Sequence, residues 1–186
     1  MTEYRSIAYC QAGHAVAARL RTDCPIDTVT IPPGEPSVSA LVREHLLGEF
    51  DLEHEPDDEI RRIRGHIEDA IFVSLAGPYA QRRHDPSSTW RSSEGIKEAS
   101  DLIHCVNRHE LGPARVVPLF RRYINARVNN FLELHWSPIE ALAHRLILDR
   151  TASRDEAAGA AVEIALTDLA DTYVEHRPDD GNDPPL

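Results

Sequence analysis

The stretch YCQAGHAV, residues 9–16, gathers residue types that bind metals and transfer protons. In the H-E-x-x-H pattern, two histidines four positions apart hold zinc from one face of a helix, and the glutamate takes a proton from the metal-bound water. Cys10, Gln11 and His14 stand at the three corresponding positions. A thiolate is also a zinc ligand, so Cys10 and His14 together can supply two ligands. The amide of Gln11 has no useful basicity, and loss of general-base catalysis costs about 100- to 10,000-fold in rate.

The same residues also have a structural interpretation. Most free cysteines are small buried hydrophobes, and a single histidine on an apolar helix face is more often a hydrogen-bonded core residue than a ligand. A third alternative is a cysteine nucleophile, with Cys10 attacking and His14 as its base, although the sequence shows no oxyanion donor or orienting group for it. We favour the structural interpretation, and the motif by itself leaves all three open.

Apolar residues recur at helical spacing through most of the chain, which predicts a mainly α-helical protein with one short β-strand or hairpin. The strand is expected at 27–31, where β-branched residues alternate before Pro-Pro-Gly. The expected helices cover residues 2–21, 58–83, 94–111, 113–136, 138–149 and 154–175. The buried stripe of the second helix is formed by Ile60, Ile63, Ile67, Ile71 and Leu75.

Gly13 lies inside the first predicted helix, close to the potential ligands. A glycine in a helix interior costs about 1 kcal/mol relative to alanine, so its presence needs a reason. We expect another helix to approach very closely at this point. The small residues Ala76 and Gly77 are the candidates for the facing surface.

The composition fits one compact domain with an acidic tail. The chain has 186 residues, of which 41 % are hydrophobic, and a formal net charge of −11. We expect a domain over residues 1–176 and a disordered, proline-rich acidic tail over 177–186. The acidic balance argues against a nucleic-acid partner. The sequence shows neither a signal peptide nor an apolar run of membrane-spanning length, so we expect a cytoplasmic protein with no membrane partner.

Five segments, taken in order, resemble the peptidase domain of FtsH-type ATP-dependent zinc metallopeptidases. The first has the pattern of that family's H-E-A-G-H helix, and the resemblance covers about residues 5–165. The ATPase module and the membrane anchor of the family are not found in the sequence. The matching segments are AYCQAGHAVAA, DTVTIPPG, IFVSLAGPYAQRR, SSEGIKEASDLIHCV and WSPIEALAHRLI.

The resemblance implies a helical fold in which Asp101, at the position of the third ligand, returns to the first helix beside His14. The metal ligands would then be Cys10, His14 and Asp101, with Cys105, one turn beyond Asp101, as a fourth. Two of the family's active-site residues are replaced, so we expect a degenerate site in which zinc is absent or weakly bound.

The resulting hypothesis is a non-catalytic binding or regulatory protein with an unidentified protein or peptide partner. We expect a monomer or a small oligomer. The alternative is an active zinc metallopeptidase or hydrolase that uses Cys10, His14 and Asp101 as its ligands.

Overall fold

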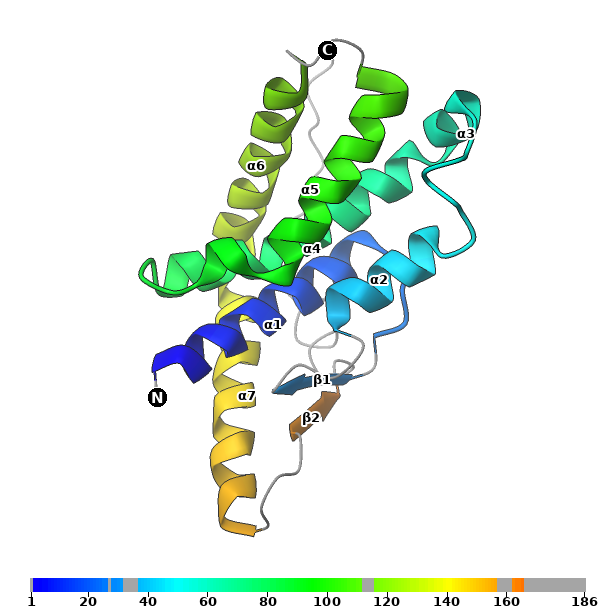
Figure 1. Cartoon of the computed structure of the whole chain (residues 1–186). Helices are drawn as coiled ribbons and strands as arrows, with labels where there is room; N and C mark the ends of the chain where they lie inside the picture. The colour runs from blue at the N-terminus through cyan, green and yellow to red at the C-terminus, as the bar shows by residue number, and fades with distance from the viewer. Residues whose placement is uncertain (1, 27, 32–36, 112–115, 157–161, 166–186) are drawn as a thin grey trace, which may run out of the picture.

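The computed structural model describes residues 2–26, 28–31, 37–111, 116–156 and 162–165, and this part of the chain is mainly helical, as predicted (Figure 1). A 3₁₀ turn, η1, covers Trp90–Ser92, and a π-helical turn, η2, covers Asn107–Leu111. The α-helices are α1 (Thr2–Arg21), α2 (Val38–Leu47), α3 (Asp57–Arg62), α4 (Arg64–His84), α5 (Glu94–Val106), α6 (Val117–Leu134) and α7 (Trp136–Glu156).

Helix α4 lies at the centre and packs against α1, α2, α5 and α6 (Figure 1). All residues from Ala70 to Gln81 are buried, so this part of α4 is enclosed on every side. A helix that is apolar all round is typical of a core helix. The predicted stripe is confirmed, because all five of its side chains are buried: Ile60, Ile63, Ile67, Ile71 and Leu75.

The predicted helix over 58–83 is interrupted at Ile63. α3 ends at Arg62 and α4 begins at Arg64, while Ile63 between them has φ −92° and ψ 7°, outside the helical region. Its side chain is only 2 % exposed. The short helix α3 and the long helix α4 therefore keep one continuous apolar surface on the core across the break in the backbone.

The close approach expected at Gly13 is confirmed. A Cβ added to Gly13 would lie 2.7 Å from the carbonyl oxygen of Ala76, 2.8 Å from Ala80 Cβ and 3.0 Å from Gly77 Cα. These separations are too short for a side chain without a shift of the α4 backbone. Helices α1 and α4 are therefore in backbone contact at the level of the candidate ligands.

The predicted helix over 154–175 is wrong for part of its length. α7 continues through Ser153 to Glu156 without a new start, and Val162–Ala165 forms strand β2. β2 pairs antiparallel with β1 (Thr28–Ile31), with Thr28 opposite Ala165 and Ile31 opposite Val162. Here, pairing with a strand that is distant in the sequence outweighs the local helical pattern. The predicted tail, 177–186, lies outside the described residues.

Helix α2 begins after a serine that caps its first turn. Ser37 precedes it with extended backbone, and its hydroxyl accepts a hydrogen bond of 3.3 Å from the Ala40 N–H. This is the usual N-cap arrangement, which satisfies one of the unpaired amides at a helix start.

Across the described segments, no helix combines the length and apolar character that crossing a lipid bilayer requires.

The two glycines Gly13 and Gly65 give a matched test of the α1–α4 contact. Gly13→Ala should lower the free energy of unfolding by about 1–3 kcal/mol, because the new methyl group overlaps α4. Gly65→Ala should raise it by up to about 1 kcal/mol, since a Cβ at Gly65 meets nothing within 4 Å and alanine favours the helix. Urea denaturation of both variants measures the difference. Equal stabilities of the Gly13→Ala and Gly65→Ala variants would contradict the close packing of α1 against α4.

Candidate functional site

His14 lies inside the protein and is hydrogen-bonded to the central helix. Its side chain is buried, and Nδ1 lies 2.8 Å from the carbonyl oxygen of Val73 in α4. A carbonyl oxygen can only accept, so Nδ1 carries the proton and donates it. The neutral ring therefore keeps its lone pair on Nε2.

Two glycines make room for the imidazole ring. A Cβ added to Gly77 would lie 2.3 Å from both Cδ2 and Nε2 of His14, and one added to Gly95 would lie 3.1 Å from Cε1. The ring thus occupies space that side chains at these positions would need. Gly77 belongs to α4 and Gly95 to the first turn of α5, so three helices meet around His14.

Pro78 contributes to this junction from within α4. Proline has no N–H, so the carbonyl of Ser74, four residues earlier, loses its usual partner in the helix. A Cβ added to Gly95 would lie 2.2 Å from that carbonyl oxygen, so the Gly95 backbone packs directly against it. The turn of α4 that contains Val73 and Ser74 thus contacts α1 through the His14 side chain and α5 through the Gly95 backbone.

Burial removes the charge from both candidate reactive groups. Desolvation lowers the pKa of His14 to about 4, against the opposing effect of the Val73 hydrogen bond. Desolvation raises the pKa of the Cys10 thiol to about 12. At neutral pH the pair is a thiol and a neutral imidazole, whereas both nucleophilic attack and metal binding require the thiolate.

The remaining predicted ligands lie elsewhere on α5. Asp101 is exposed, and it follows Gly95 by six residues, which is about 9 Å of helix rise. The thiol of Cys105 donates to the carbonyl of Leu52 at 3.4 Å. In the described ranges, no three His, Cys, Asp or Glu side chains are grouped so as to hold a metal ion. The structure therefore does not bring Cys10, His14, Asp101 and Cys105 together as one ligand set.

The α5 residue against His14 is Gly95, which the sequence interpretation passed over. The only available signal was a small residue in the first turn of a helix, and such residues are common. The α5 residue that lies against His14 therefore has no side chain to offer a ligand.

Glu98 is a second buried polar residue that the sequence interpretation missed. It lies one turn after Gly95, is 8 % exposed, and accepts a hydrogen bond of 3.2 Å from the Ser74 hydroxyl. Burial raises the pKa of its carboxyl group, while hydrogen bonds from Ser39 and Ser74 and the charge of Arg43 act in the opposite direction. Ser74 thus contacts Gly95 through its carbonyl and Glu98 through its hydroxyl.

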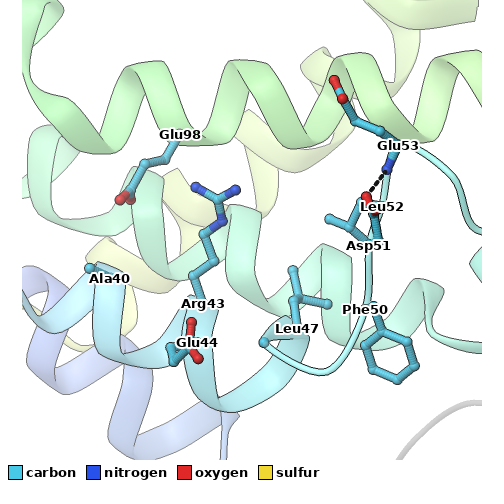
Figure 2. A pocket seen from close by; sticks show the side chains of 10 residues that line it. Ala40, Arg43, Glu44, Leu47, Phe50, Asp51, Leu52, Glu53 and Glu98 are labelled. Carbon is cyan, nitrogen blue, oxygen red and sulfur yellow. Dashed lines mark hydrogen bonds between the residues drawn. The ribbon is translucent and has the colours of Figure 1, made fainter.

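Glu98 also lines a pocket of about 450 Å³ between α2, α5 and the segment that follows α2 (Figure 2). Arg43 extends from α2 toward Glu98, and Asp51 accepts a hydrogen bond from the Glu53 N–H at 3.3 Å across the segment that borders the pocket (Figure 2). The apolar lining comes from Ala40, Leu47, Phe50 and Leu52, and the charged lining from Arg43, Glu44, Asp51, Glu53 and Glu98.

Comparison with known proteins gives no further assignment. No family model matches the sequence, and no curated protein or solved structure is found to be similar to it. The resemblance to FtsH-type peptidase domains therefore stays a prediction from the sequence.

The lowered pKa of His14 predicts a pH-dependent stability. With a folded pKa of about 4 and an unfolded value near 6.5, only the unfolded state takes up a proton between these limits. This contribution to stability is full above pH 6.5 and is lost as the pH falls toward 4, by an amount of the order of 3 kcal/mol.

His14→Asn is the control, because the amide can still donate to Val73 but does not titrate. Urea denaturation of both proteins between pH 7 and pH 4 should show the wild type losing stability faster. Other groups with lowered pKa values, such as His84 and His135, are present in both proteins and cancel in the difference. If the difference in unfolding free energy between the wild type and His14→Asn did not change with pH, the burial of a neutral imidazole would be contradicted.

Proposed function

We propose that this chain is a non-catalytic binding or regulatory domain built on an FtsH-peptidase-like helical scaffold. One observation carries the proposal: the imidazole of His14 serves inside the core as a neutral donor to Val73, enclosed by Gly77 and Gly95. The histidine of the motif thus has a structural role that connects three helices.

The positions around His14 do not supply the groups that hydrolysis needs. A catalytic zinc site needs three protein ligands, an open position for water and a base. Here Cys10 offers a thiol with a pKa of about 12, Gln11 offers an amide, and Gly95 offers no donor. A buried thiol and a neutral ring also lack the activation that a cysteine nucleophile requires.

Two features support descent from a metal-binding scaffold. The first is the return of α5 to the histidine of α1, as the family resemblance leads one to expect. The second is the hydrogen bond of His14 itself, because metal-ligating histidines usually donate their other ring N–H to a carbonyl or carboxylate. In this proposal, the orientation of the imidazole is retained while the other ligands are lost.

Zinc content and peptide hydrolysis test the loss of catalysis. Protein purified without chelator should carry well under one zinc per chain, by elemental analysis, and should not hydrolyse casein when zinc is added. Close to one equivalent of zinc, with hydrolysis that Asp101→Asn and His14→Asn both abolish, would instead support the zinc peptidase that uses Cys10, His14 and Asp101.

Restoring the motif tests the descent of the scaffold. Cys10→His combined with Gln11→Glu should raise zinc affinity by about tenfold or more, because a second imidazole joins His14 four residues away on one helix. Cys10→Ser combined with Gln11→Glu is the matched control without the imidazole. Equal, negligible affinities in two proteins with native circular dichroism would contradict a retained metal-site geometry.

A further inference from the structure

We infer that the pocket between α2 and α5 receives an arginine or lysine side chain of a peptide partner. This inference rests on the proposed function, because it names the kind of partner that the binding domain takes.

The shape suits one long side chain with an apolar stem. The volume of about 450 Å³ lies at the lower end of the range of ligand pockets. Leu47 is buried and Phe50 and Leu52 are half-buried, so the pocket has an apolar wall. Arginine and lysine place their methylene groups along such surfaces and direct the charged end elsewhere.

The charges favour a cation. Four carboxylates line the pocket against a single guanidinium, which comes from Arg43. Glu44, Asp51 and Glu53 are exposed, where they attract a basic partner and raise its association rate. An acidic peptide or a nucleic acid would meet repulsion at the same positions.

Glu98 distinguishes the pocket from an ordinary group of surface acids. It is 8 % exposed, and the hydroxyl groups of Ser39 and Ser74 donate hydrogen bonds to its carboxylate. Burial disfavours its charged form, so a cation that enters the pocket gains a charge-assisted hydrogen bond and relieves that cost.

Within the chain itself, Arg43 already places a positive charge near Glu98. It extends toward Glu98 from α2 and lowers the pKa that burial raises (Figure 2). A basic side chain of a partner would therefore compete with Arg43 for the same carboxylate. Removing the Arg43 side chain should tighten binding, whereas removing the charge of Glu98 should weaken it.

The probes are two end-blocked pentapeptides, Gly-Leu-Arg-Leu-Gly and its citrulline counterpart, which has the same shape and no charge. Titration into ¹⁵N-labelled protein, followed by NMR, should give saturable shifts within residues 40–53 and 95–99. The citrulline peptide should bind about tenfold more weakly or worse. Absence of saturable shifts at millimolar peptide, or equal binding of both peptides, would overturn the inference.

Variants assign the effect to the pocket. Glu98→Gln should lower the affinity for the arginine peptide by about tenfold, and Arg43→Ala should raise that affinity by several-fold. Glu133→Gln on α6 is the matched control, an exposed acid outside the pocket lining, and should leave the affinity unchanged. Ala40→Met fills the pocket without altering its charge and should weaken both peptides. Wild-type affinity in folded Glu98→Gln or Ala40→Met would contradict the proposed site.

This inference and the proposed function fail separately. A zinc-free, inactive protein that ignores the arginine peptide would overturn only the occupant of the pocket. A protein that binds zinc and hydrolyses casein would overturn the non-catalytic function, whatever the peptide titration shows.

Discussion

The hydrogen bond from His14 to the carbonyl of Val73 determines how the centre of this protein is assembled. It places an imidazole where α1, α4 and α5 meet, and the ring fits only because Gly77 and Gly95 have no side chains. Gly13, next to His14, brings the α1 backbone into contact with the same stretch of α4. A Cβ at any of these glycines would lie 2.7 Å or less from an atom of a neighbouring helix, so that helix or side chain would have to shift, since interiors are close-packed.

The same assembly accounts for the chemistry of the surrounding groups. Enclosure of α1 keeps the Cys10 thiol protonated and the His14 ring neutral at pH 7. Ser74 connects this junction to the pocket, because its carbonyl lies against Gly95 and its hydroxyl holds Glu98. The interior that keeps Cys10 and His14 uncharged thus also positions a buried carboxylate at the pocket between α2 and α5.

The features that depend on local periodicity or residue size could be predicted from the sequence. The stripe through Ile67 is buried, and the contact of Gly13 with Ala76 follows from the cost of a glycine inside a helix. The partner of His14 could not be predicted, because it depends on how α4 packs against α1. The position of Asp101 could not be predicted either, because it depends on how α5 is rotated against α4. The pocket was missed for a similar reason, since Glu98 belongs to it only through the packing of separate elements.

The central claim is that His14 is a neutral structural donor and not a metal ligand. Long-range ¹H–¹⁵N NMR of the histidine rings reports the tautomer and zinc binding of His14 in one sample. The account predicts a proton on Nδ1 at pH 7 and a spectrum that one equivalent of zinc leaves unchanged. A proton on Nε2 would contradict the hydrogen bond to Val73, and a zinc-dependent shift of Nε2 would show that His14 is still a metal ligand.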